Sequence, residues 1–316
     1  MSANRSGLAH FFAVVAVLFL LRIALAYIAV PVGVAPALSL LNTVLFLGLA
    51  IYGLYRAASH EWKPGLAIGL LLVGALAHAG GEITVSSLPD SGLAIVAVSA
   101  IAQAGILVWC LGLGALLSLG IKDKNMMVPV AIFLAGFDIY LVFNPSAPMF
   151  SFLRENPELV RRLLMAVPSA NVDGAATGTV QNLAYIGPAD LLFSATFFAL
   201  MFRYGMRAKR TVQWLIPVLL AYLLIVIYLG PETAIGPFSL SMLPALVPIG
   251  LVVLLVNRKE FKMERQEVLA SIGVAVLAVS LASYGVYRAA TQPAGPAPPT
   301  EPSQMQGGQE PPGYQG

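Results

Sequence analysis

The sequence predicts an all-α membrane protein, a polytopic bundle of about nine transmembrane helices with its N-terminus in the cytoplasm. Of its 316 residues, 58% are hydrophobic and only 10% are charged, whereas soluble domains carry about 25% charged residues. Mean hydropathy is +0.83, and long apolar runs recur from residue 8 to residue 287. Because about 20 apolar residues in a helix cross the hydrocarbon core of a bilayer, these runs predict membrane spans.

Nine apolar segments have the length of a membrane span, or nearly so. Their limits are 8–30, 35–56, 65–84, 92–119, 126–145, 182–202, 212–230, 240–256 and 267–287. In the first span, Arg22 is expected to snorkel or to pair with another helix. Glycines of the third and fourth spans are expected to let helices approach closely; they are Gly65, Gly69, Gly74, Gly112 and Gly114.

The Lys and Arg residues of the links predict the orientation of the chain. With nine spans, one side of the membrane receives Arg5, the basic residues around the second link, and those before the fifth span and after the sixth and eighth. The opposite side has fewer, and includes acidic or neutral links such as 81–92 and 230–237. Since cytoplasmic loops are enriched in Lys and Arg, the N-terminus is predicted in the cytoplasm and the C-terminus outside.

Residue types that bind metals or form disulfides are scarce. Cys110 is the only cysteine, which excludes an intrachain disulfide and a cysteine-based metal site. His10, His60 and His78 show no ligand spacing, so no metal and no cofactor is predicted. The formal charge of +3 comes mostly from the links and indicates membrane topology rather than a nucleic-acid partner. The oligomeric state is left open.

Two carboxylates interrupt the apolar spans. Asp138 lies in AGFDIYLVFNP (135–145) and Asp190 in YIGPADLLFSATFFAL (185–200). A charged group near the centre of a membrane helix costs roughly 2.5–3.5 kcal/mol, so such residues usually mark a functional site. Both acids are predicted roughly 10–12 Å from the outer ends of their spans at helical rise. Pro244 enters the eighth span from the same side, which puts all three residues in one layer.

Two acids at one depth have a defined chemistry. They cannot both ionise readily, so one proton is expected to be held between them. The protonated acid can polarise a peptide carbonyl while the ionised acid takes a proton from water, as in aspartic proteases. Asn144, Ser194 and Thr196 are candidates to line the polar cavity that water requires. Pro244 cannot continue an intrahelical hydrogen bond, so the segment beside the acids could receive an unwound peptide.

These residues resemble the three signatures of presenilins and signal peptide peptidases, the family of intramembrane aspartyl proteases. That family carries Tyr-Asp on one helix, Gly-x-Gly-Asp on the next and Pro-Ala-Leu on a later one. Here the same order is kept by Phe137-Asp138, Gly187-Pro188-Ala189-Asp190 and Pro244-Ala245-Leu246. The resemblance covers mainly residues 126–256. It implies that Asp138 and Asp190 are the catalytic pair, and that Phe137, Gly187, Pro244, Ala245 and Leu246 form the substrate-binding and active-site loop.

The resemblance also implies a substrate and a location. Peptide bonds within transmembrane segments or remnant signal peptides would be hydrolysed, so transmembrane peptides and the lipid bilayer are the expected partners. A divergent prokaryotic homologue in the cytoplasmic membrane is expected.

The chain then divides into 1–125, an N-terminal four-helix membrane region; 126–256, the catalytic membrane core; 257–290, a final transmembrane helix; and 291–316, a disordered tail. In the long link 146–181, residues 149–167 predict an amphipathic helix on the outer interface and residues 169–179 a flexible segment.

The chain departs from the family pattern at three positions. Phe137 lacks the hydroxyl of Tyr, Ala189 replaces the second Gly, and Pro188 removes an N–H and is expected to kink its helix. Two other functions stay open. The same buried acids could serve a proton-coupled transporter or channel, although no repeat of the kind that many transporters show is visible. The chain could also be a catalytically inactive relative that binds transmembrane helices.

Overall fold

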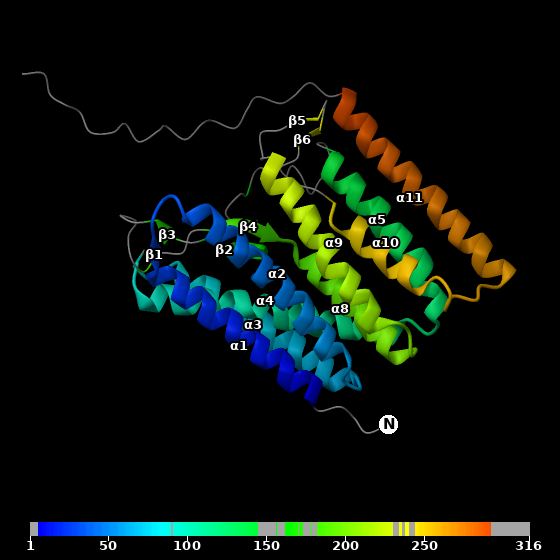
Figure 1. The fold of residues 1–316 in the computed structure, drawn as a ribbon. Coiled ribbons are helices and arrows are strands. Elements are labelled where there is room, and N and C mark those ends of the chain that lie inside the picture. Colours follow the sequence, from blue (N-terminus) through cyan, green and yellow to red (C-terminus); the bar gives the residue numbers. More distant parts are fainter. Residues whose placement is uncertain are drawn as a thin grey trace, which may run out of the picture.

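The structure is a computed structural model in which most of the chain is helical (Figure 1). It describes residues 6–89, 91–144, 156, 162–169, 171–172, 178, 182–229, 234–235, 238–239 and 244–291. Of these residues, 79% are helical, and the strands are no longer than five residues. The predicted helical bundle is therefore confirmed for the described part of the chain.

Each of the nine predicted spans contains a helix. The helices are α1 (Ser6–Tyr27), α2 (Ala35–Ala58), α3 (Pro64–Val85), α4 (Leu93–Gly120), α5 (Met127–Phe143), α8 (Pro188–Arg203), α9 (Ala208–Leu229), α10 (Leu246–Asn257) and α11 (Arg265–Thr291). Seven of them are long and apolar enough to cross a membrane. In this set α5 is counted together with the 3-10 turn Lys124–Met126 that precedes it. These seven helices identify a membrane protein. The other two, α8 with 16 residues and α10 with 12, are shorter than predicted.

Helices α8 and α10 are short because both begin later than the sequence predicted. Residues 182–186 form strand β4 (Asn182–Ile186) instead of the first turns of a helix. Pro188 then occupies the first turn of α8, where its missing N–H would have no intrahelical partner in any case. The predicted kink at Pro188 is therefore wrong, since this proline starts the helix. Helix α10 begins at Leu246, two residues after Pro244.

Short strands lie in three links between helices, and three of the strands belong to the long link between α5 and α8. β2 (Met165–Pro168) pairs antiparallel with β4, and β1 (Ala29–Val30) pairs parallel with β3 (Asn171–Val172). A third pair joins β5 (Ala234–Ile235) to β6 (Phe238–Ser239). The amphipathic helix predicted over 149–167 is wrong at its end, because 165–168 form a fully buried strand. Most of its remaining residues, most of 169–179, and 292–316 lie outside the described residues.

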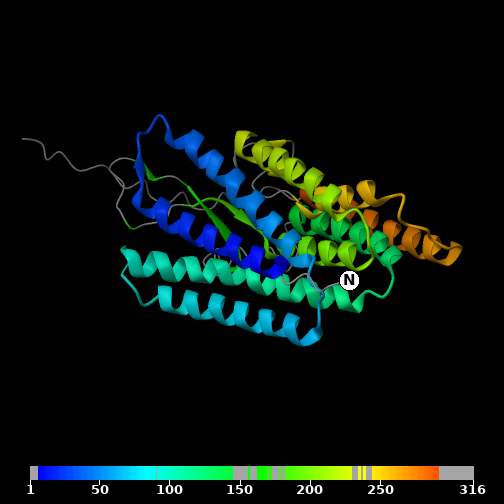
Figure 2. The same ribbon diagram turned by 60° about the horizontal axis from the view of Figure 1, so that its bottom comes forward.

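Helix α8 lies in the middle of the bundle. It packs against α4, α2 and α10, while α3 covers α4 and α11 covers α5. Figures 1 and 2 show α1–α4 on one side of α8 and α5, α10 and α11 on the other. One hydrophobic cluster joins both sides, from Phe11 in α1 to Val253 in α10. The helix that carries Asp190 is therefore held by neighbours from both ends of the sequence.

Glycines set the close helix contacts. A Cβ atom at Gly74 would lie 2.3 Å from the backbone nitrogen of Trp109, and one at Gly112 would lie 2.4 Å from that of Leu71, so α3 and α4 meet at backbone distance. Gly114 makes the corresponding contact between α4 and α8. The predicted role is thus confirmed for Gly74, Gly112 and Gly114. It is wrong for Gly65 and Gly69, which have no atom near their missing side chains among the described residues.

Arg22 is buried inside the bundle and holds the strand pair in place. Only 3% of it is exposed. Its guanidinium donates hydrogen bonds to the backbone oxygen of Ala166 at 2.8 Å and to Oδ1 of Asn182 at 3.4 Å, so it joins β2 to β4. The expected snorkelling is wrong, because the strand pair offers acceptors within the bundle and buried polar groups require such partners.

Two further buried side chains fix β2 from other helices. Oε1 of Gln103 in α4 accepts a hydrogen bond from the backbone nitrogen of Ala166 at 2.7 Å. The side-chain amide of Asn42 in α2 donates to the backbone oxygen of Pro168. Helices α1, α2 and α4 therefore all anchor the strand pair that leads into α8.

Candidate functional site

Asp138 of α5 directly contacts the segment Pro244-Ala245-Leu246. The backbone N–H of Leu246 donates a hydrogen bond of 2.8 Å to Oδ2 of Asp138. Leu246 is the first residue of α10 and Ala245 is its N-cap, without a capping side chain of its own. The first N–H groups of a helix have no intrahelical partner and carry a partial positive charge, which favours a carboxylate there. Asp138 therefore accepts a hydrogen bond from an N–H group at the start of α10 that has no partner within α10, and it does so from a neighbouring helix.

Asp190 lies in the first turn of α8. Its backbone N–H donates to the oxygen of Gly187 at 3.1 Å, and its carboxylate lies close enough to that of Asp138 for the two to interact electrostatically. Asp190 and Asp138 belong to helices separated by the long link, yet they share one site. The structure thus brings Asp138 together with Asp190 and with Leu246, which lies two residues after Pro244, the third residue that the sequence predicted at this depth.

Gly187 is adjacent to the Asp190 carboxylate. A Cβ atom at position 187 would lie 3.0 Å from Oδ2 of Asp190, which is tighter than an ordinary van der Waals contact. The lack of a side chain at Gly187 therefore leaves room for the carboxylate in its present position. Ala189, where the family has its second Gly, is exposed.

We expect Gly187→Ala to displace the Asp190 carboxylate and to lower any activity of the pair by ten- to a hundredfold, since misplacing a reacting group by about 1 Å costs up to about 10²-fold. The rate of the peptide cleavage that the sequence predicts, assayed in liposomes, measures this effect. Gly65→Ala is the matched control, because a Cβ there would meet no described atom. Equal loss in both variants would argue against a specific role of Gly187.

Tyr222 of α9 is a neighbour of the pair that the sequence did not single out. Its hydroxyl interacts electrostatically with both Asp138 and Asp190. A phenol can donate a hydrogen bond to a carboxylate, so Tyr222 can orient whichever acid carries the negative charge. The thiol of Cys110 in α4 donates to the oxygen of Pro188, two residues before Asp190, at 3.4 Å.

For the peptide cleavage that the sequence predicts, we expect Tyr222→Phe to lower the rate about tenfold, which corresponds to about 1.4 kcal/mol of lost electrostatic stabilisation. Tyr140→Phe is the matched control. Tyr140 is two residues from Asp138, but its ring stacks with Phe137 and Tyr284. Rates are compared in liposomes at saturating substrate, and an unchanged rate for Tyr222→Phe would exclude a contribution of its hydroxyl.

Other predicted site residues have different surroundings. The ring of Phe137 stacks between Phe133 and Tyr140, and 37% of Phe137 is exposed, so its described contacts are with aromatic rings. Thr196 is buried and its hydroxyl donates to the oxygen of Leu192 in its own helix; its place beside a polar cavity stays a prediction. Ser194 and Asn144 are also buried. The Ser194 hydroxyl has no hydrogen-bond partner among the described residues.

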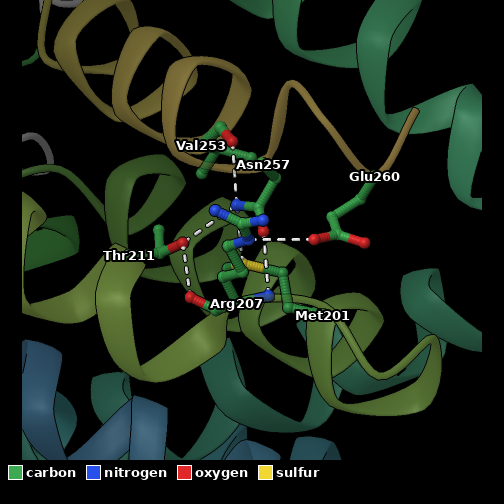
Figure 3. A network of polar contacts seen from close by, with 6 residues as sticks. All are labelled: Met201, Arg207, Thr211, Val253, Asn257 and Glu260. Carbon is green, nitrogen blue, oxygen red and sulfur yellow. Dashed lines mark hydrogen bonds and ion pairs between the residues drawn. The ribbon is translucent and has the colours of Figure 1, made fainter.

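A polar network ties together α8, α9 and α10 at the end of α10 away from Leu246 (Figure 3). The side chain of Asn257, fully buried, donates to Oγ1 of Thr211 at 2.9 Å and accepts from the backbone N–H of Arg207 at 2.9 Å. It also donates to the sulfur of Met201 in α8 at 3.4 Å. Because α8 carries Asp190, α9 carries Tyr222 and α10 begins at Leu246, this network fixes the three helices relative to one another.

The described residues contain no group of three His, Cys, Asp or Glu side chains that could hold a metal ion. The site is thus built from two carboxylates, a phenol, a thiol and the start of a helix. Comparisons of the chain with protein-family models, with curated proteins and with solved structures found no match.

Proposed function

We propose that this protein is an intramembrane aspartyl protease of the presenilin and signal peptide peptidase type, with Asp138 and Asp190 as its catalytic pair. The observation that carries the proposal is the convergence at Asp138. One carboxylate interacts electrostatically with Asp190 and accepts a hydrogen bond from Leu246, so the three sequence signatures meet at one place. Each signature is short, and their meeting at one site is a tertiary arrangement that no single signature specifies.

In the proposed mechanism the pair holds one proton. The ionised acid takes a proton from a water molecule, which attacks the peptide carbonyl, while the protonated acid transfers its proton to the carbonyl oxygen, so that a neutral tetrahedral diol forms and the pair again holds one proton. The N–H of Leu246 keeps Asp138 in position. Tyr222, whose hydroxyl interacts electrostatically with both acids, is proposed to donate to the acid that carries the negative charge. Proton transfer back to the amide nitrogen releases two peptides.

Strand β4 supports the proposal because it offers an edge to which an unwound substrate can bind. A transmembrane helix hides its carbonyl groups in internal hydrogen bonds, so a substrate must unwind before cleavage. β4 pairs with β2 along one edge, and within the described residues its other edge has no partner strand. The strand ends at Ile186, four residues before Asp190. An unwound substrate can add to that edge as a further strand and present its carbonyl groups to the acids.

The proposal is tested with the purified full chain in liposomes. A single-pass peptide with Gly and Pro in its apolar segment should be cut within that segment, at a position located by mass spectrometry. A matched peptide with an all-Leu segment should be cut more slowly, because its helix unwinds less readily. Proton flux along a pH gradient is measured in the same liposomes.

The outcomes separate the three functions. Cleavage within the apolar segment supports the protease. Proton flux that is lost in Asp138→Asn, with neither peptide cut, contradicts the protease and favours a transporter. If neither cleavage nor proton flux is observed, the protease and the transporter are both contradicted, and an inactive relative is favoured.

A further inference from the structure

A groove runs between α9 and α10 on the outside of the bundle, with a volume of about 480 Å³. Its walls are Trp214 and Val218 from α9 and Leu251 and Leu255 from α10. Trp214 is 56% exposed, Leu251 56% and Leu255 55%. Large apolar side chains that are exposed on a membrane helix face acyl chains. The middle of this groove is therefore a surface for lipid.

The end of the groove at the start of α9 and the end of α10 is cationic. Arg207, Arg210, Arg258 and Lys259 line it. Arg207 is held by Glu260, with 2.9 Å between Nε and Oε1, and by the network of Figure 3. Arg210, Arg258 and Lys259 are exposed and have no hydrogen-bond or ion-pair partner in the described part of the chain. Three positive charges therefore face the mouth of the groove uncompensated.

The charged and apolar parts have the spacing of a lipid molecule. Arg210 and Val218 are separated by about 12 Å along α9 at helical rise, which spans the distance from a headgroup to the upper part of an acyl chain. Trp214 lies between them, at the position that Trp prefers at the membrane interface. Basic pockets between transmembrane helices on the cytoplasmic side bind anionic headgroups, and the positive-inside rule assigns this end of the helices to the cytoplasm.

We propose that the α9–α10 groove binds one anionic phospholipid of the cytoplasmic leaflet. Its phosphate lies among Arg210, Arg258 and Lys259, and one acyl chain lies along Trp214, Leu251 and Leu255. This inference does not depend on proteolysis, since it rests on charge and apolar surface at the opposite end of α10 from Leu246. A lipid here contacts the two helices that carry Tyr222 and the segment beside Asp138.

Trp214 provides a direct probe. A Trp62→Phe/Trp109→Phe protein, in which Trp214 is the only tryptophan, is reconstituted in nanodiscs that contain phosphatidylglycerol or phosphatidylcholine brominated on the acyl chains. We expect brominated phosphatidylglycerol at low mole fraction to quench Trp214 with at least tenfold higher apparent affinity, because each Lys or Arg near an anionic surface strengthens binding about fivefold. Salt should weaken the preference.

The groove variant Arg210→Gln/Arg258→Gln/Lys259→Gln should lose this preference. Lys63→Gln/Lys122→Gln/Lys124→Gln is the control, because it removes the same charge from the same predicted side of the membrane but away from the groove. Native mass spectrometry of the unmodified protein should show retained phosphatidylglycerol, which inorganic phosphate does not displace. Equal quenching by the two lipids, equal loss in both variants, or displacement by phosphate would overturn the proposal.

Discussion

Asp138→Asn and Asp190→Asn are each expected to lower the rate of peptide cleavage by at least about 10²–10⁴-fold, the usual effect of removing a general acid or base. Asparagine keeps the shape of the side chain, but it neither takes a proton from water nor shares one with the other acid. At position 138 its amide oxygen can still accept the hydrogen bond from Leu246. The start of α10 should therefore stay in place, and the loss of rate should not come from misfolding.

Initial rates in liposomes, at equal amounts of monodisperse protein, measure this effect. Glu61→Gln is the matched control, since it removes an exposed carboxylate from the link between α2 and α3 and should leave the rate unchanged. The double variant should be no slower than either single variant, because the two acids act as one unit. A rate above one tenth of wild type in either single variant would remove that acid from the mechanism.

Arg22→Met is expected to lower the free energy of unfolding by about 2–3 kcal/mol, the contribution of a buried hydrogen bond from a charged group. Met fills much of the volume but cannot donate to Ala166 or Asn182, so the oxygen of Ala166 loses a partner inside the bundle. The cleavage rate should also fall, because β4 leads directly into Gly187 and α8. Arg22 is more than 150 residues from Asp190 in the sequence, and the strand pair links them.

Unfolding is followed by circular dichroism during titration with denaturant in mild detergent, and the rate by the liposome assay. Arg56→Met is the control: Arg56 also lies on a membrane helix, but its guanidinium makes a 3.3 Å contact with the exposed His10, which should contribute less than about 1 kcal/mol. If Arg22→Met unfolds like wild type, the guanidinium does not anchor the strands. If stability falls but the rate per folded molecule does not, the strand pair does not position Asp190.

The apolar pattern of the sequence was enough to locate the helices, because length and hydropathy are local properties. It was less reliable at the starts of α8 and α10. Residues 182–186 are apolar like the helix that follows, and only pairing with β2 makes them a strand. Such pairing depends on residues distant in the sequence. The same reason explains why Arg22 was misassigned, since its acceptors belong to these strands.

The site was predictable where an anomaly marked it. A carboxylate in an apolar span is rare, so Asp138 and Asp190 could be found, and Asp138 indeed contacts the segment that follows Pro244, through the N–H of Leu246. Tyr222 could not be found in this way, because a single tyrosine in a membrane helix is usual. Its relation to the acids depends on how α9 packs against α10. Phe137 was chosen for its place in a motif, yet its ring lies in an aromatic stack.

Catalysis by the pair requires the carboxylates of Asp138 in α5 and Asp190 in α8 to lie within reach of each other, as their electrostatic interaction indicates. Cross-linking in membranes measures this proximity, with Asp138→Cys and Asp190→Cys in a Cys110→Ser background and a short bifunctional thiol reagent. The structure predicts efficient cross-linking of this pair and little for Phe137→Cys with Asp190→Cys, because the ring of Phe137 stacks with Phe133 and Tyr140. No cross-link at 138–190, or equal yields for both pairs, would contradict this proximity.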